Sequence, residues 1–300
     1  LTHLPRSTMA RGRGFNVLVA TDGSADARAA LAATLAFPWP AGARAFGVVA
    51  AAAPAATELP VAVWTALGAG QEGVAAAARR TLGPRWPDAQ VSVVNQAPVP
   101  GIVSEARRCR ASTIVVGSRG LGAVGRFLMG SVSRSVVRDA RCPVLVVNRR
   151  VRRFARFVVG LDGSANARRA LDFIAGLEVP PGGRVDVVRA VEPVNLPSLG
   201  LMPAAVRTTL RRQVALLTGR RLGAARREVE VAAKRLDRAG WKARSIVRTG
   251  VPLHKVLKAA AGADCLVVGA RGVGGVERLL LGSVAQGLLN RSPIPVLVVR

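Results

Sequence analysis

The sequence has little cysteine and little histidine, and this limits the chemistry that it can support. It holds three cysteines, Cys109, Cys142 and Cys265, and two histidines in 300 residues. An odd, widely spaced set of cysteines offers no disulfide framework and no CxxC metal knuckle. Two histidines are too few for a histidine-based zinc site. We therefore expect no metal site, and a reducing, cytoplasmic location.

Long apolar runs are also missing. No stretch of about 18 residues lacks both charges and glycine or proline breaks, so no membrane-spanning helix is predicted. Residues 1–14 are basic and lack the apolar segment of a secretory signal, so we expect a flexible tail there. Half of the residues are nevertheless apolar, which excludes a disordered chain. The length suits two domains of about 150 residues.

Acidic residues are few, and nearly all of the positive charge is arginine. There are 17 Asp and Glu against 44 Lys and Arg, and the net charge of +27 is spread over both halves. Nucleic acid, other polyanions and nucleotides are all plausible partners, and a genome-wide arginine bias would give the same composition. Cys109, beside Arg107, Arg108 and Arg110, has the most electropositive setting of the three cysteines, which favours a lowered thiol pKa.

The chain repeats itself. Residues 15–24 resemble residues 156–164, and Ala-x-Ala-Arg-x-Ala-Leu follows in both places, 140 positions apart. Later matches, including two Pro-Val-Leu-Val-Val endings, lie 152 positions apart, so the second copy has a net gain of twelve residues within 196–248. We predict two tandem domains, 15–148 and 156–300, with a linker over 149–155.

Within each copy, short apolar runs alternate with helical segments. This order predicts an α/β fold, with a doubly wound parallel sheet of five strands and helices on both faces in each domain. The expected strands are 17–20, 46–52, 91–95, 114–116 and 144–147, then 158–161, 185–191, 245–248, 266–268 and 296–299. Helices are expected after each Asp-Gly-Ser and over 72–82, 102–108, 132–139, 206–239, 255–261 and 284–290.

Two features fall at the carboxyl ends of the strands, where open α/β sheets bind ligands. An acid, Asp22 or Asp162, ends the first strand of each copy. A glycine loop follows the fourth strand with the same spacing twice: Gly117-x2-Gly120-x9-Gly130-Ser131 and Gly269-x2-Gly272-x9-Gly282-Ser283.

These loops predict a polyphosphate site. Glycines let backbone N–H groups approach an anion, and each Gly-Ser pair opens a helix whose N-terminus attracts negative charge. Arg119 and Arg271 lie inside the loops, where they could neutralise phosphate charge. The alternative is that the glycines serve only tight turns and close helix packing, and the repeated spacing weakens it.

Two rival motifs are set aside. Gly-x-Gly-x-x-Gly occurs at 120–125, but it follows the fourth strand rather than the first, and the second copy places Glu277 at the last glycine. No Gly-Lys-Ser/Thr is present, so the loop is not a P-loop.

With these residues in place, the chain resembles the universal stress protein family in its tandem form. The first-strand Val-Leu-Val-Ala-Thr-Asp-Gly-Ser, the G-x2-G-x9-G-S/T loop and the Pro-Val-Leu-Val-Val ending carry the resemblance over nearly the whole chain. The resemblance implies a strand order of 3-2-1-4-5 in each domain. It also implies that ATP, with or without Mg²⁺, binds across strands one and four. It also implies dimers through the closing strands, 144–147 and 296–299; whether these pair internally or with another chain stays open.

The resemblance further assigns roles to residues. Asp22 and Asp162 would bond adenine or ribose. The loop glycines, with Ser131 and Ser283, would hold ribose and phosphates, and the backbone N–H groups of Val132 and Val284 would follow the phosphate-binding turn. Ala50 and Ala190 would border the adenine. Gly250 matches a family glycine after the third strand, whereas the first copy has Gln96, whose side chain would crowd the nucleotide. This difference predicts tighter binding in the second copy.

The leading hypothesis is an ATP-binding stress-response regulatory protein in which nucleotide acts as a ligand. Rapid hydrolysis is not expected, because no Glu, His or Gln is placed to orient a water. A slow ATPase and an arginine-rich nucleic-acid-binding protein remain as alternatives. Residues 207–244 hold twelve basic and three acidic residues, which form either a solvated face or a docking face for an acidic partner, nucleic acid or anionic lipid.

Overall fold

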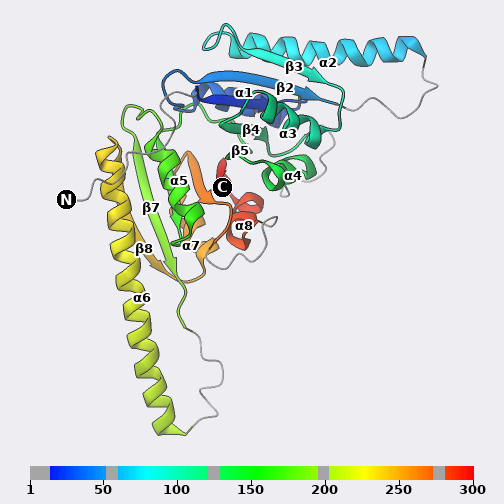
Figure 1. Ribbon diagram of the computed structural model, residues 1–300. Helices are drawn as coiled ribbons and strands as arrows, with labels where there is room; N and C mark the ends of the chain where they lie inside the picture. Colours follow the sequence, from blue (N-terminus) through cyan, green and yellow to red (C-terminus); the bar gives the residue numbers. More distant parts are fainter. Residues whose placement is uncertain (1–13, 52–59, 121–128, 195–202, 273–280) are drawn as a thin grey trace.

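The computed structural model describes residues 14–51, 60–120, 129–194, 203–272 and 281–300. Strands and helices alternate along both halves (Figure 1). The first half contains β1 (Asn16–Ala20), α1 (Ala25–Ala36), β2 (Arg44–Ala50), α2 (Val61–Leu82), β3 (Gln90–Val94), α3 (Pro98–Arg108), β4 (Thr113–Gly117), α4 (Ser131–Asp139) and β5 (Val144–Val147). The second contains β6 (Arg156–Leu161), α5 (Ala165–Ala175), β7 (Arg184–Val191), α6 (Ala204–Arg238), β8 (Lys242–Thr249), α7 (Pro252–Ala259), β9 (Cys265–Gly269), α8 (Ser283–Arg291) and β10 (Val296–Val299).

All of these strands belong to one sheet, in the order β3-β2-β1-β4-β5-β10-β9-β6-β7-β8. Within each half the neighbouring strands are parallel and follow the order 3-2-1-4-5, so the predicted α/β fold of two tandem domains is confirmed. β5 and β10 are antiparallel, with Leu145 opposite Leu297, and they join the two halves inside one chain (Figure 1). Of the two pairings left open for the closing strands, the internal one is therefore present.

The two faces of the sheet carry separate cores. Helices α1, α2, α5 and α6 cover one face, and α3, α4, α7 and α8 cover the other. Both faces are covered, so the central strands are apolar at nearly every position, as in Val144–Val147 and Val296–Val299.

An aromatic cluster spans the two halves on the first face. It consists of Phe15, Phe37, Trp39, Phe154, Phe157, Phe173 and Trp241. The ring centroids of Phe37 and Phe154 are 5.0 Å apart, although the two residues belong to different halves. Val151 and Phe154 are buried, so the segment predicted as a linker packs into the core.

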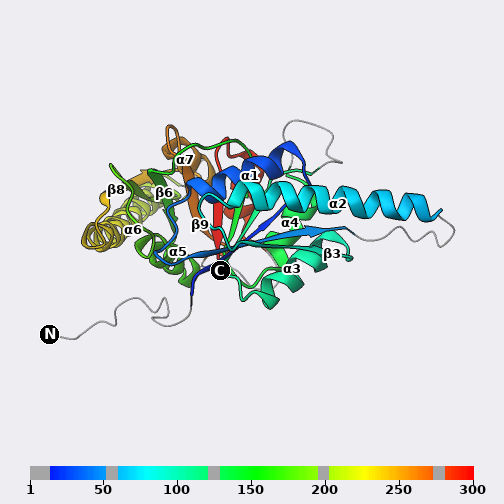
Figure 2. The same cartoon turned by 90° about the horizontal axis from the view of Figure 1, so that it is seen from above.

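Two helices extend past the sheet. One of them, α2, begins at Val61 rather than at the predicted residue 72. The other, α6, has 35 residues against 22 in α2, and this difference accounts for the extra length of the second copy. Both project beyond their strands (Figures 1 and 2). No side chain of α6 is buried before Ala225, because this first part of the helix lies beyond the sheet. No helix in the described part of the chain is long and apolar enough to cross a membrane.

Candidate functional site

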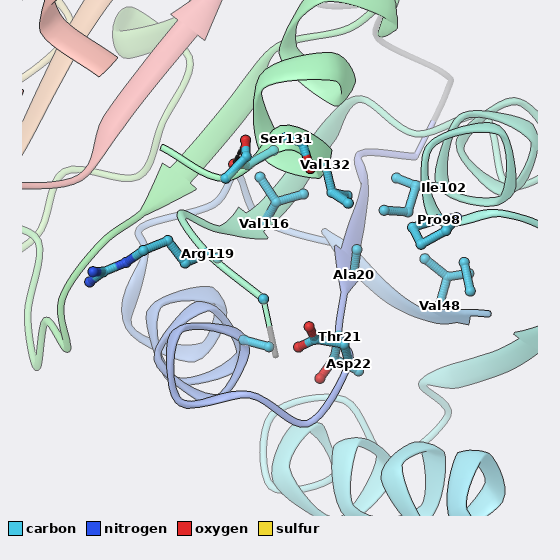
Figure 3. A pocket seen from close by; sticks show the side chains of 16 residues that line it. Ala20, Thr21, Asp22, Val48, Pro98, Ile102, Val116, Arg119, Ser131 and Val132 are labelled. Carbon is cyan, nitrogen blue, oxygen red and sulfur yellow. Dashed lines mark hydrogen bonds between the residues drawn. The ribbon is translucent and has the colours of Figure 1, made fainter. Parts of the chain in front are cut away.

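A cavity of about 420 Å³ lies at the carboxyl ends of β1 and β4 in the first half (Figure 3). Its volume falls within the usual range for small-molecule sites. All eight first-copy residues predicted from the sequence line it, together with neighbours that the sequence did not single out: Ala20, Thr21, Asp22, Ala27, Val48, Ala50, Pro98, Ile102, Val116, Gly117, Arg119, Gly120, Gly130, Ser131, Val132 and Ser133. One wall is apolar, from β2 and α3, and the opposite wall is formed by the glycine loop and the start of α4 (Figure 3).

Packing within the protein already requires Gly117 and leaves little space for a side chain at Gly120. A Cβ on Gly117 would lie 2.7 Å from the backbone carbon of Asp26, because α1 passes directly against the end of β4. A Cβ on Gly120 would lie 2.6 Å from Oδ2 of Asp22. Close packing therefore explains Gly117 and Gly120 without a ligand, and the case for a ligand rests on other features.

The uncapped start of α4 is one such feature. Gly130 is its N-cap and supplies no side-chain hydrogen bond, whereas Ser24 caps α1 by accepting from the Ala27 N–H at 3.2 Å. The Gly130 N–H donates to the Ser118 carbonyl at 2.8 Å, so it is occupied. Ser131 and Val132 lie in the first turn of α4, beside the cavity, and their N–H groups belong to the positive end of the helix dipole. This arrangement favours an anionic group.

The turn after β1 fixes the acid and the loop together. Oδ1 of Asp22 accepts from the Ser24 N–H at 3.0 Å, and the Ser24 hydroxyl donates to the Arg119 carbonyl at 3.4 Å. Ser24 thus caps α1 and contacts the glycine loop. The sequence showed Ser24 only as part of a turn, although its repetition as Ser164 was a usable signal.

Arg119 does not point into the cavity, contrary to expectation. Arg119 is among the residues that line the cavity, but its guanidinium points away from it (Figure 3). Nε of Arg119 donates to Oδ2 of Asp26 at 3.2 Å, on α1. Asp26 lies 93 positions before Arg119 and was not among the predicted site residues.

The second half repeats the contacts of the turn after its first strand. Oδ1 of Asp162 accepts from the Ser164 N–H at 3.0 Å, and Ser164 Oγ donates to the Arg271 carbonyl at 3.1 Å. A Cβ on Gly272 would meet Oδ2 of Asp162 at 2.5 Å, as at Gly120. Remaining equivalents of the first-half site are Gly269 at the end of β9, Gly282 as the N-cap of α8, Ser283 and Val284 in its first turn, and Ala190 near the end of β7.

The two halves differ beside the third strand. Gly250 has a φ of +126°, and a Cβ there would collide with the side chain of Lys255. In the first half, Gln96 is not among the residues that line the cavity, and its side-chain oxygen accepts from the Ser104 hydroxyl at 3.2 Å. Crowding by Gln96 therefore has no support here, and the ranking of the two sites stays a prediction.

The cysteines are not set up for reactivity. Burial raises the pKa of Cys109, with Glu105 adding to the shift, so the expected lowering is wrong. Burial also raises the pKa of Cys142 to about 12, and it raises the pKa of Cys265. Among the described residues, no group of three His, Cys, Asp or Glu side chains could hold a metal ion.

In the first part of the basic segment, the arginines are distributed around the helix rather than along one side of it. The α6 arm, which we define as residues 204–222, has five arginines, no acidic residue and no buried side chain. Arg211 and Arg220 lie about 180° apart around the helix. The arginines of the arm therefore do not share one face of the helix, and the choice between a solvated surface and a docking surface stays a prediction.

The chain is similar to known proteins over most of its length. The family model described as the universal stress protein family matches residues 15–148 and 153–300. A universal stress protein of Mycobacterium tuberculosis, Rv2005c, is 33% identical over 224 residues, covering 69% of this chain and 68% of that protein. A second one, Rv1996, is 33% identical over 211 residues, covering 67% and 62%. The crystal structure of a universal stress protein from Archaeoglobus fulgidus shares the fold, with a TM-score of 0.65, 19% identity and coverage of 95% and 98%.

Proposed function

The chain belongs to the universal stress protein family, and we propose that it is a regulatory member that binds ATP at the carboxyl ends of β1 and β4 and at the equivalent position in the second half. The observation that carries the proposal is the cavity of about 420 Å³, which combines an apolar wall with the uncapped start of α4. An adenine ring suits the apolar wall of Val48, Ala50 and Ile102. The phosphates suit the N–H groups of Ser131 and Val132.

Nucleotide would act as a ligand. Among the described residues that line the cavity, Asp22 is the only ionisable acid, and there is no Glu, His or Gln to activate a water. Binding would stabilise the conformation of the protein that holds the nucleotide, and this is the usual way in which a ligand shifts a regulatory protein. Asp22, which also lines the cavity, would bond the adenine or the ribose, and Mg²⁺ could accompany the phosphates.

A charge placed at the start of each helix tests the proposal without threatening the fold. Ser131 is exposed at the first position of α4, where an aspartate stabilises the helix dipole and at the same time repels phosphate. We expect Ser131→Asp with Ser283→Asp to keep or raise the melting temperature and to abolish ATP binding measured by calorimetry. The matched control is Gly68→Asp, on an exposed turn of α2 with no atom within 4 Å of its added Cβ.

The protein's own content gives the first result. Purified protein is denatured, and the released nucleotide is identified by mass and ultraviolet absorbance. Released ATP, or ATP binding below millimolar concentration that the paired aspartates remove, supports the proposal. No nucleotide and no binding at millimolar ATP would overturn it. Steady phosphate release lost in the same variant would instead favour the slow ATPase.

Nucleic-acid binding is the second candidate function, and the α6 arm is the observation that favours it. Arginines all around a projecting helix can contact phosphates on both walls of a groove, whereas a membrane surface requires a one-sided helix. Retention on duplex DNA at about 0.15 M salt, reduced by Arg211→Gln with Arg220→Gln and independent of ATP, would establish it.

A further inference from the structure

Asp26 contacts two side chains next to the cavity, those of Ser118 and Arg119. Its Oδ2 accepts from the Ser118 hydroxyl at 2.7 Å and from Arg119 Nε at 3.2 Å. The Arg119 side chain is 30% exposed and that of Asp26 is 19% exposed, so the ion pair is partly shielded from water. Asp26 lies in the first turn of α1, and this position also favours its negative charge. The carboxylate is thus well placed to hold Arg119 on α1.

The backbone of Arg119 lies beside the start of α4. A Cβ built on Gly130 would be 3.4 Å from the Cα of Arg119. This closeness places the space in front of Ser131, like Asp26, within the length of the Arg119 side chain, so rotation about the side-chain bonds would carry the guanidinium from one to the other. An anion at the α4 N-terminus would compete directly with Asp26 for this cation.

We propose that Asp26 is a specificity-determining counter-ion of the first site, and that Arg119 exchanges between Asp26 and the terminal phosphates of a bound nucleoside triphosphate. The inference rests on the proposed function. Breaking the Arg119–Asp26 pair offsets part of the gain from the phosphate contact, so Asp26 keeps the affinity for triphosphate low. Adenosine has no phosphate and does not draw Arg119 away, so its affinity is independent of the pair.

The second half contains a natural counterpart with different residues. Asn166 stands at the position of Asp26, and Ala270 at that of Ser118. The Asn166 side-chain amide donates to the Arg271 carbonyl at 3.4 Å, and its oxygen accepts from Arg169. Tandem copies thus offer one site with the carboxylate and one with the amide in a single chain.

The experiment measures the first site alone, in full-length protein that carries Ser283→Asp. Calorimetry gives the affinities for ATP and for adenosine with and without Asp26→Asn, which keeps an acceptor for Ser118. We expect the substitution to raise ATP affinity roughly fivefold. Adenosine affinity should stay within about twofold.

A second pair of variants separates exchange from simple removal of a negative charge. When Arg119→Ala is present, Asp26→Asn should bring no gain in ATP affinity. A gain that persists without Arg119, an equal gain for adenosine, or no gain at all would overturn the proposal. These outcomes still leave ATP bound, whereas failure of the proposed function leaves every variant without ATP binding, the parent included.

Discussion

Arg300, which follows β10, donates through Nη2 to the backbone carbonyl of Val137 in α4 at 2.7 Å. The opposite relationship joins the other ends: Asn148, which follows β5, donates through Nδ2 to the carbonyl of Ser292 at the end of α8, also at 2.7 Å. Each half therefore caps the carboxyl end of the helix whose amino end lies at the candidate site of the other half. The antiparallel pairing of β5 and β10 makes this exchange possible.

Arg300→Met should destabilise the protein. Methionine keeps most of the apolar stem and removes the donors to α4, leaving carbonyls at a helix end with fewer partners. We expect a loss of about 1–2 kcal/mol in the free energy of unfolding, measured with urea. Arg212→Met, on the exposed α6 arm, is the control and should change stability by less than about 0.5 kcal/mol. Equal effects in the two variants would contradict the cap.

Gly117→Ala should lower stability, whereas Gly68→Ala should raise it. The added Cβ at Gly117 would meet backbone atoms of Asp26 and Ala27 within 3 Å, and backbone cannot move as a flexible side chain can. The added Cβ at Gly68 meets nothing within 4 Å, and alanine is the better helix former by about 0.5–1 kcal/mol. Thermal melts of the two variants check the signs. A Gly117→Ala protein as stable as the parent would show that α1 can retreat from β4.

The stability of the first half should depend on pH through Glu105. Hydrogen bonds from Arg108, at 2.6 and 2.7 Å, lower the pKa of this carboxyl from its ordinary 4.5, and Ser92 adds to the effect, although burial opposes it. A lowered pKa means that the stabilisation is complete above the unfolded value and is lost as the pH falls through the folded value. Glu105→Gln should therefore lose about 1–2 kcal/mol at pH 7 and show a flatter decline below about pH 4.5. Urea titrations at several pH values test this, and parallel curves for the two proteins would contradict it.

The sequence was informative where the signal is local and repeated. Runs such as Val144–Val147 and Val296–Val299 mark strands buried on both faces, and the matched glycine spacing located the first-half cavity. The second copy helped because chance patterns, such as the glycines at 120–125, are not repeated in it.

Contacts between residues that lie far apart in the sequence could not be predicted from local patterns. The direction of Arg119 depends on Asp26, which folding brings next to it from α1. The pKa of Cys109 is governed by burial rather than by the three neighbouring arginines, and burial follows from how α3 packs. The start of α2 at Val61 was missed because its first turns lie past the sheet, so the helix continues without the apolar periodicity of a packed face.

Phe154→Ala should weaken both halves together. Its ring is 1% exposed and packs against Phe37 of the first half, at 5.0 Å between centroids, and against Phe157 of the second, at 6.4 Å. Deleting a buried phenylalanine leaves a cavity and costs about 3–5 kcal/mol. Because the cavity would adjoin both halves, urea unfolding of the variant, followed through tryptophan fluorescence, should shift as one transition. Val63→Ala, on the exposed surface of α2, serves as the control for loss of an apolar side chain. Separate transitions, with only one half shifted, would show that the aromatic cluster does not couple the two domains.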